Sequence, residues 1–293
     1  MILLDGKKIA QDIRTELKIE IDKLKAQGKN VPGLAAILVG NNPASEIYVN
    51  SKTKDCNEIG MKTVTEKRES NISEGELIDL IKTYNSNKDF HGILVQLPLP
   101  KHINEDKVIE AISPKKDVDG FHPVNVGNLV IGKEAFRSCT PAGIQELLIR
   151  YKIETKGKHV VVLGRSNIVG KPIANIMLQK KEHANSVVTI CHSAAPDISY
   201  YTKQADILIA AIGSPQFVKV DMVKDGVVVI DVGINRIEDK NTKKEYRIVG
   251  DVDFDEVSKK ASYITPVPGG VGLMTRAMLL KNTFEAYLKY NNK

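Results

Sequence analysis

The stretch KHVVVLGRSNIVGKP, residues 158–172, decides the fold class. An apolar run typical of a buried strand leads directly into a turn with two glycines, and KPIANIMLQKK (171–181) then has the pattern of a helix. Strand, glycine turn and helix in this order are typical of a dinucleotide-binding unit. Gly164 permits the tight turn, and Gly170 permits close packing of the helix on the strand. Ser166 stands where the usual pattern has its second glycine.

The segments after this stretch continue the alternation. Further strands are predicted at SVVTICHS (186–193), ADILIAAIG (205–213) and GVVVIDVGIN (226–235), and SYITPVPGGVGLM (262–274) closes the series. The expected fold is α/β, with a doubly wound, Rossmann-like domain over residues 139–269. The last helix is expected at about 274–290.

The first half of the chain predicts a second α/β domain, over residues 1–138. Strands are expected at 34–40 and 92–100, with a further one at 62–68, and helices at 43–60, 73–87 and 104–112. Residues 113–132 are rich in turn-forming types and predict a loop that crosses between the domains. Thr140 is expected to cap a helix over 140–151, with Pro141 in its first turn.

The second strand of the nucleotide domain indicates which dinucleotide binds. Domains that bind NAD place an acidic residue near the end of this strand, where it accepts the ribose hydroxyl. Here the strand ends in Cys191, His192 and Ser193, without an acid. Together with Arg165 in the glycine turn, whose planar fork suits a phosphate, this pattern favours NADP.

Composition narrows the class of protein. With 42% hydrophobic and 27% charged residues, the 293-residue chain is typical of a globular protein, and no window has the apolar length of a membrane span. The net charge of +6 favours anionic partners, but the basic residues form no block, which argues against nucleic acid. Three cysteines without a C-x-x-C pair and six scattered histidines predict no disulfide framework and no metal site, and a cytoplasmic location.

Four polar side chains of the first domain are candidate catalytic residues. Tyr48 and Lys52 lie four residues apart in a predicted helix and so share a face. Gln96 interrupts an apolar strand, where a buried amide needs partners. Asp119, like Asp117, lies in a loop, where aspartate also commonly closes turns. The pattern Y-x-x-x-K is used by short-chain dehydrogenases too, but there it follows the glycine turn within one domain, whereas here it precedes Gly164.

Taken together, these stretches resemble the bifunctional methylenetetrahydrofolate dehydrogenase/cyclohydrolase family. The resemblance spans nearly the whole chain, in family order. It rests on ASEIYVNSK (44–52), GILVQLPLP (92–100), KDVDGFHPVNVG (116–127), CTPAG (139–143), GRSNIVGKP (164–172), IDVGIN (230–235), GDVDF (250–254) and YITPVPGGVGLMT (263–275). The chain departs from the family pattern at Leu273, where the family usually has proline, and at Ser138, which precedes Cys139 in place of proline.

The resemblance implies a role for each matching residue. Tyr48 matches the aromatic residue that stacks on the folate, Lys52 the catalytic lysine, Gln96 the amide that positions this lysine, and Asp119 the carboxylate that holds the pterin. The turn with Pro266 and Gly270 is implied to border the folate. The residues implied to contact the cofactor are Gly164, Arg165, Ser166, Ser193, Ile234 and Thr140.

The architecture and activity that the resemblance implies are also specific. Two domains flank a folate-binding cleft, NADP binds the second domain, and the C-terminal helix (about 270–293) returns to the first. The enzyme oxidises methylene-tetrahydrofolate to the methenyl cation with NADP and hydrolyses that cation to formyl-tetrahydrofolate, as a homodimer. A partly desolvated lysine beside an amide is expected to have a lowered pKa and to serve as general base or as electrostatic organiser.

Other functions stay open at this level. A member of the family with only one of the two activities has the same motifs, and a shikimate-type NADP dehydrogenase has a similar arrangement of domains. A non-catalytic NADP-binding protein is the alternative from another class. The combination of Lys52, Gln96 and Asp119 argues against the last, because a binding module has no evident need for the lysine–amide pair.

Overall fold

The computed structural model describes residues 1–239 and 245–291, which divide into two compact units. The large-sheet unit comprises the described parts of residues 1–10 and 140–275, and the small-sheet unit those of 11–139 and 276–293. The chain therefore passes from one unit to the other within α1 (Gly6–Ala26), near the start of α6 (Cys139–Arg150) and within α10 (Val271–Asn291).

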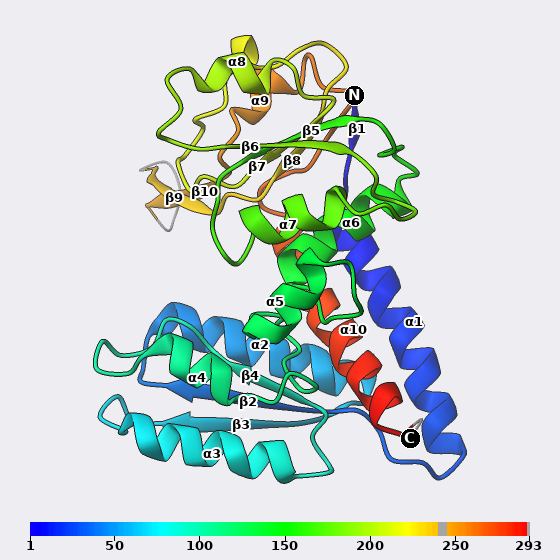
Figure 1. Cartoon of the computed structure of the whole chain (residues 1–293), viewed down its shortest axis with the longest axis vertical. Helices are drawn as coiled ribbons and strands as arrows, with labels where there is room; N and C mark the ends of the chain where they lie inside the picture. The colour runs from blue at the N-terminus through cyan, green and yellow to red at the C-terminus, as the bar shows by residue number, and fades with distance from the viewer. Residues whose placement is uncertain (240–244, 292–293) are drawn as a thin grey trace. The chain divides into compact units, whose positions relative to one another are not determined.

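The small-sheet unit is built on parallel strands in the order β3-β2-β4. Their bounds are β2 (Gly33–Val39), β3 (Lys62–Arg68) and β4 (Gly92–Val95). Every residue of β2 is buried, and Ala35, Ile37 and Val39 pack with α3 (Glu74–Ser86) in one core. Figure 1 shows α2 (Pro43–Ile59) on the other face of this sheet. The unit also contains α4 (Glu105–Ala111) and α5 (Pro123–Val130).

Local capping explains where two of these helices begin and end. Asn42 accepts hydrogen bonds from the Ala44 and Ser45 N–H groups at the start of α2, and Gly60, with φ +83°, ends that helix in the left-handed region. Ser73 and Glu76 form a reciprocal capping box at the start of α3. The predicted bounds of both helices are confirmed to within a residue because these signals are local in sequence.

The large-sheet unit contains a sheet that is parallel throughout, with strand order β1-β11-β8-β7-β5-β6. The strands are β1 (Ile2–Leu3), β5 (His159–Leu163), β6 (Val187–Cys191), β7 (Ile207–Ala210), β8 (Val228–Asp231) and β11 (Tyr263–Ile264). The helices are α7 (Gly170–Met177), α8 (Ile198–Thr202), the 3₁₀ turn η1 (Val220–Met222) and α9 (Phe254–Val257), with parts of α1, α6 and α10. Figure 1 shows α8 and α9 on one side of the sheet and α6 and α7 on the other, which is the predicted doubly wound arrangement.

Several sequence-based expectations need correction. The first ten residues belong to the large-sheet unit, because β1 pairs with β11. The expected loop 113–132 contains α5, which His122 caps by accepting from the Val124 N–H group. Thr140 is not a cap, since α6 begins at Cys139. The helix α1 and the antiparallel hairpin of β9 (Asn235–Glu238) and β10 (Tyr246–Val249) were not anticipated.

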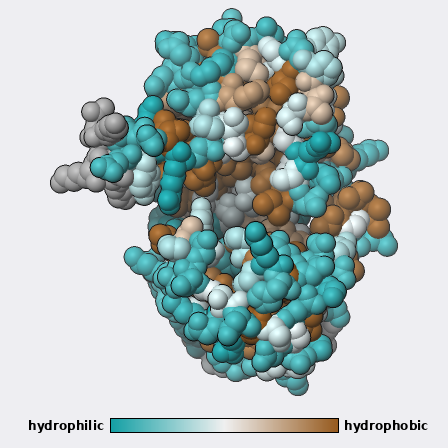
Figure 2. All heavy atoms as spheres, turned by 90° about the vertical axis from the view of Figure 1, so that its left-hand side faces the viewer, coloured by the Kyte–Doolittle hydropathy of each residue, from teal (hydrophilic) through white to brown (hydrophobic). Residues whose placement is uncertain are grey.

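The face of the small-sheet unit seen in Figure 2 is polar. On the face shown in Figure 2, hydrophilic residues cover most of the small-sheet unit. No helix in residues 1–239 and 245–291 is long and apolar enough to cross a membrane.

The buried His91 beside β4 predicts a pH-dependent stability. Its Nδ1 accepts a hydrogen bond from the Gly33 N–H group at 3.1 Å, and burial lowers the pKa of His91 to about 4, with the Lys116 ammonium acting in the same direction. The unfolded chain binds this proton near pH 6.5, so stability falls as the pH decreases from there towards 4. Between pH 7 and 5 this one group removes about 2 kcal/mol from the free energy of unfolding.

Urea unfolding at pH 7 and pH 5 checks this expectation. His91→Gln should lose stability by about 2 kcal/mol less than the unmodified chain over this interval. His102→Gln is the control, because His102 is an exposed side chain of the same unit. An equal pH dependence in His91→Gln and the unmodified chain would contradict the assignment.

Candidate active site

Helix α2 carries the first two candidate residues. Tyr48 and Lys52 lie one turn apart, so both side chains leave the same face of the helix. Tyr48 is 45% exposed, and Lys52 is half-buried. An exposed ring beside a partly covered ammonium is a suitable surface for a planar ligand that develops charge.

Lys52 is paired with the predicted amide. Its Nζ donates to Oε1 of Gln96 at 3.2 Å, and Gln96 lies directly after the end of β4. Nε2 of Gln96 donates to the Leu97 carbonyl at 2.8 Å. Because this bond orients the amide group, the amide oxygen is directed at Lys52 and accepts a hydrogen bond from its Nζ.

The structure gives Asp119, which the resemblance selected, different hydrogen-bond partners from those of Asp117. The Asp117 carboxylate accepts hydrogen bonds from the N–H groups of Gly120, Phe121 and His122 and from Nδ2 of Asn125. It therefore closes the turn before α5. Asp119 has no such role in the described chain, and it lines a small pocket to which Asp117 also contributes. The other residues of that pocket are Ile93, Val95, Leu97, Ile109, Ile112, Asp117 and Phe121.

Electrostatics link Asp119 to Lys52. Burial raises the pKa of the Asp119 carboxyl above its usual value, and the nearby Lys52 ammonium acts in the opposite direction. Burial, followed by Asp119, raises the pKa of the Cys139 thiol well above its usual value, so this group stays protonated and can donate to Asp119 at 3.8 Å. Lys52, Gln96 and Asp119 therefore belong to one cluster.

Two supporting residues of this cluster had no predicted role. Cys139 donates to the Val118 carbonyl at 3.3 Å, and Asn282 of α10 donates to the same carbonyl at 2.8 Å and to Arg137 at 3.1 Å. These bonds fix the backbone beside Asp119. The motif CTPAG contained Cys139, but nothing local in the sequence relates Asn282 to residues more than 140 positions earlier.

The glycine turn lies at the carboxyl end of β5, where the strand order reverses between β6 and β7. A Cβ on Gly164, which has φ +125°, would lie 2.1 Å from the Ala211 carbonyl oxygen, and one on Gly170 would lie 2.3 Å from the Gly164 oxygen. Oγ of Ser166 accepts from the Val169 and Gly170 N–H groups at the start of α7. Such a crevice is where doubly wound sheets bind dinucleotides.

Arg165 and Ser193 are available for a ligand at this edge. Both are exposed, and neither has an ion pair or side-chain hydrogen bond to another residue of the described chain. The nearest acid after β6 is Asp197, which accepts from the Tyr200 N–H group at the start of α8. The end of β6 thus presents the Ser193 hydroxyl group and has no acidic side chain in the position that would bind a free ribose.

Two buried aspartates that sequence analysis did not single out hold the neighbouring loops. Asp251 accepts from the N–H groups of Ile212 and Gly213 after β7, and Asp231 accepts from those of Gly233, Asp251 and Val252. Burial raises the pKa of Asp231 to about 7. These bonds place Ile234, which is 55% exposed, directly beyond the end of β8.

The remaining predicted residues also lie in the large-sheet unit. Oγ1 of Thr140 is 2.8 Å from Oγ1 of Thr275, which joins α6 to the start of α10. Gly270 is buried, and a Cβ there would lie 2.6 Å from the Pro266 carbonyl oxygen. The structure therefore brings Lys52, Gln96 and Asp119 together in one unit and places Pro266, Gly270 and the residues predicted to bind the cofactor in the other.

Gly164→Ala is expected to destabilise the turn after β5. The substitution adds a clash with the Ala211 backbone to the strain of a left-handed residue, and strained residues of this kind cost about 1–3 kcal/mol. Gly157→Ala is the matched control, because Gly157 has φ +72° and nothing within 4 Å of its Cβ position. Urea unfolding should show a larger loss for Gly164→Ala, and equal losses would mean that the backbone clash relaxes freely.

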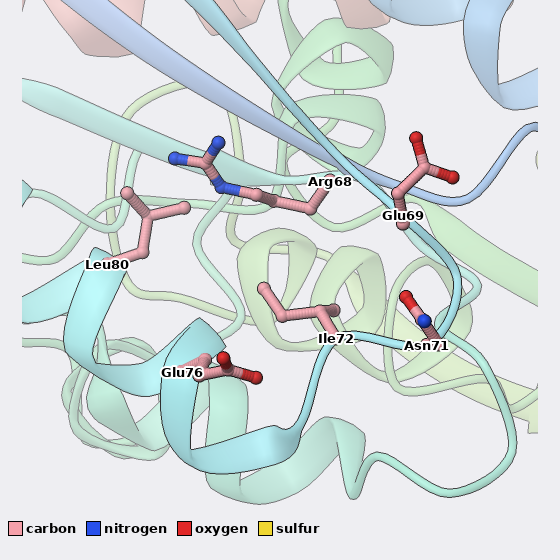
Figure 3. Close-up of a pocket in the computed structure, with 6 residues that line it drawn as sticks. All are labelled: Arg68, Glu69, Asn71, Ile72, Glu76 and Leu80. Carbon is pink, nitrogen blue, oxygen red and sulfur yellow. The ribbon is translucent and has the colours of Figure 1, made fainter.

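A second groove in the small-sheet unit lies apart from the candidate catalytic residues. Figure 3 shows it between the end of β3 and α3, lined by Arg68, Glu69, Asn71, Ile72, Glu76 and Leu80. Arg68 pairs with Glu66 at 2.7 Å, and Glu76 accepts from the Ser73 N–H group of the capping box. Arg68 and Glu76 thus serve the local structure, and the groove contains none of the candidate catalytic residues.

Comparison with known proteins identifies the family. The domain described as "Tetrahydrofolate dehydrogenase/cyclohydrolase, catalytic domain" matches residues 4–119, and "Tetrahydrofolate dehydrogenase/cyclohydrolase, NAD(P)-binding domain" matches residues 138–291. The chain belongs to the tetrahydrofolate dehydrogenase/cyclohydrolase family. The resemblance inferred from the motifs is confirmed.

Individual members of the tetrahydrofolate dehydrogenase/cyclohydrolase family match over nearly full length. "Bifunctional protein FolD" of Chloroherpeton thalassium is 60% identical, with 98% of each chain covered. The solved bifunctional FolD of Campylobacter jejuni is 51% identical with a TM-score of 0.93, and 99% of each chain is covered. The FolD of Trypanosoma brucei, solved with NADP cofactor and inhibitor, is 37% identical with a TM-score of 0.93, covering 100% of this chain and 99% of that one.

Proposed function

We propose that this chain oxidises methylene-tetrahydrofolate to methenyl-tetrahydrofolate with NADP and hydrolyses the methenyl product to formyl-tetrahydrofolate. The observation that carries the proposal is the Lys52–Gln96 pair beside Asp119, in a chain whose other unit has a dinucleotide-binding turn. Family membership supports both activities. In this proposal the small-sheet unit binds and converts folate, and the large-sheet unit binds NADP.

Asp119 and Tyr48 are proposed to bind the pterin. A pterin edge presents adjacent N–H donors, and one carboxylate accepts two of them with defined geometry. The Cys139 thiol, which also contacts the Val118 carbonyl, donates to the Asp119 carboxylate. The exposed Tyr48 ring, on the same face of α2 as Lys52, offers a surface on which the flat pterin stacks.

Lys52 is proposed to assist hydrolysis. Water adds to the methenyl carbon and loses one proton, which gives a neutral carbinolamine. One carbon–nitrogen bond then breaks, its electron pair goes to the departing nitrogen, and the hydroxyl proton is transferred to that nitrogen, which leaves the formyl group on the other nitrogen. In this proposal Lys52, oriented by Gln96, accepts or relays the proton that the water loses when its amine is neutral. Gln96 keeps the flexible lysine chain directed at one position, which is the orientation that efficient proton transfer needs.

The residues at the large-sheet edge fit NADP. Glycines at 164 and 170 keep the backbone compact after β5, and in this proposal a pyrophosphate approaches the start of α7 closely. Exposed Arg165 and Ser193 offer donors to a ribose phosphate, and the end of β6 lacks the acid that a free ribose would need. Bound NADP supplies the hydride acceptor for the oxidation. The loops held by Asp231 and Asp251 are proposed to position Ile234 against the cofactor, and Thr140 is proposed to lie near its nicotinamide end.

The remaining expectations follow from the family resemblance. We propose that Pro266 and Gly270 contribute backbone to the folate site, and that the chain works as a homodimer in the cytoplasm. Light scattering of the purified protein would test the homodimer, which requires twice the mass of one chain.

One assay tests the proposed function. The purified protein is incubated with methylene-tetrahydrofolate and NADP, or with NAD, while reduced cofactor, methenyl-folate and formyl-folate are followed together. NADPH and formyl-folate with little free methenyl-folate are expected. NADPH with accumulating methenyl-folate would support the alternative of a monofunctional dehydrogenase, and the absence of any reduced cofactor would contradict the proposal.

A further inference from the structure

A largely buried ion pair links the C-terminal helix to the helix that carries Lys52. Nε of Arg276, on α10, donates to Oδ2 of Asp55 at 2.7 Å, and its NH2 donates to Oδ1 of Asp55 and to the Ser51 carbonyl. The Asp55 side chain is only 4% exposed. This is a bidentate guanidinium–carboxylate ion pair, which holds both side chains in a defined geometry.

The position of Asp55 makes this pair relevant to the candidate site. Asp55 follows Lys52 by three residues on α2, and residues at this spacing are neighbours on a helix surface. Lysine and aspartate at this spacing commonly form an ion pair, and the lysine chain is flexible enough to reach. Lys52 instead bonds to Gln96, and no ion pair joins it to Asp55 in the described structure.

The charges of Asp55 and Lys52 both affect the pKa of the neighbouring Cys56 thiol. Burial, followed by the Asp55 carboxylate, raises the pKa of the Cys56 thiol to about 12, while the Lys52 ammonium acts against them. The Lys52 ammonium also opposes the rise that burial causes in the pKa of the Asp119 carboxyl and of the Cys139 thiol. The charge of Lys52 is therefore felt by Asp119, which is proposed to bind substrate, while its neighbour on α2, Asp55, is already paired with Arg276.

We propose that Arg276 is a positioning residue that keeps Asp55 from binding Lys52. By occupying both oxygens of the Asp55 carboxylate, the guanidinium leaves Lys52 to Gln96 and to the reacting folate. Without Arg276, a buried and unpartnered carboxylate would be left next to Lys52, and an unpaired buried charge recruits an available counter-ion. This inference rests on the proposed catalytic role of Lys52.

A four-membered set of variants separates charge from packing. Arg276→Gln removes the charge but keeps a hydrogen-bonding side chain, Asp55→Asn removes the carboxylate, the double variant removes both, and Arg276→Lys keeps the charge. Hydrolysis of methenyl-tetrahydrofolate is followed without NADP, which isolates this step from cofactor binding. The kcat, the KM and the unfolding midpoint are measured for each variant, with Lys52→Met in parallel.

Arg276→Gln is expected to lower kcat at least about tenfold, because a general base held in an ion pair loses part of its 10²–10⁴-fold contribution. The KM should change little, Arg276→Lys should keep most of the activity, and the double variant should recover most of the lost kcat. A double variant as slow as Arg276→Gln, or a single variant as active as the unmodified chain, would overturn the proposal.

Two further comparisons cover the remaining cases. If the Arg276→Gln variant does not fold, kcat is compared between Asp55→Asn and the double variant. The two kcat values should be equal, because Arg276 has no charged carboxylate to occupy once residue 55 is asparagine. A drop in that neutral background would overturn the proposal as well. Full hydrolysis by Lys52→Met would instead show that the proposed function of Lys52 is wrong, which is a separate failure.

Discussion

Lys52→Met should reduce the hydrolysis of methenyl-tetrahydrofolate by about 10²–10⁴-fold, the range for loss of a general acid–base group. Methionine keeps the length and apolar part of the side chain but cannot accept or relay a proton, and it leaves Oε1 of Gln96 without its donor. The NADP-dependent oxidation should be retained in part, because hydride transfer depends mainly on orientation of the two reactants. Accumulation of methenyl-folate, followed by its absorbance, is the direct readout.

Lys54→Met is the matched control for this variant. Lys54 lies on the same helix, its side chain is 75% exposed, and its partner is Glu58 at 3.8 Å. The control should hydrolyse methenyl-folate at the rate of the unmodified chain. Unchanged production of formyl-folate by Lys52→Met would remove Lys52 from the mechanism.

The second large effect is expected on the choice of nucleotide. Arg165→Ser should raise the KM for NADP by about 10–150-fold, which corresponds to about 1.5–3 kcal/mol for a hydrogen bond to a charged group. The KM for NAD should change little, because NAD lacks the ribose phosphate that Arg165 is proposed to bind. Initial rates with each nucleotide at saturating methylene-tetrahydrofolate give both constants.

A control and a contrary outcome accompany this prediction. Lys203→Ser removes an exposed cation from the same unit and should leave both KM values unchanged. An equal loss with NADP and NAD would mean that Arg165 acts on the part shared by both nucleotides. Hydrolysis of methenyl-tetrahydrofolate without nucleotide should be unaffected in either variant.

Much of the fold was predictable because its signals are local. The β5 strand, the glycine turn and the start of α7 follow one another within a dozen residues, and the caps of α2 and α3 lie within four residues of the groups that they bind. The missed features depend on distant partners. The strand β1 has two residues and exists because β11, far along the chain, accepts it as a neighbour.

The candidate site divides in the same way. Tyr48 and Lys52 could be paired from helical spacing alone, and motif resemblance supplied Gln96 and Asp119. Residue types alone could not separate Asp119 from Asp117, because both lie in one turn-rich loop, and the choice of Asp119 came from the resemblance. The structure adds a physical reason for this choice, because three backbone N–H groups converge on Asp117 and occupy its carboxylate.

By itself, the sequence determined the α/β class, the glycine turn, the missing acid after β6 and the family, since each depends on residue types at short spacing. Only the tertiary structure decided which groups touch. It joined Lys52 to Gln96 across 44 residues, fixed the backbone beside Asp119 with Asn282, and placed Arg276 on Asp55 from 221 residues away. The physical reason is that hydrogen bonds and ion pairs depend on distances in space, which chain folding sets and local sequence pattern does not contain.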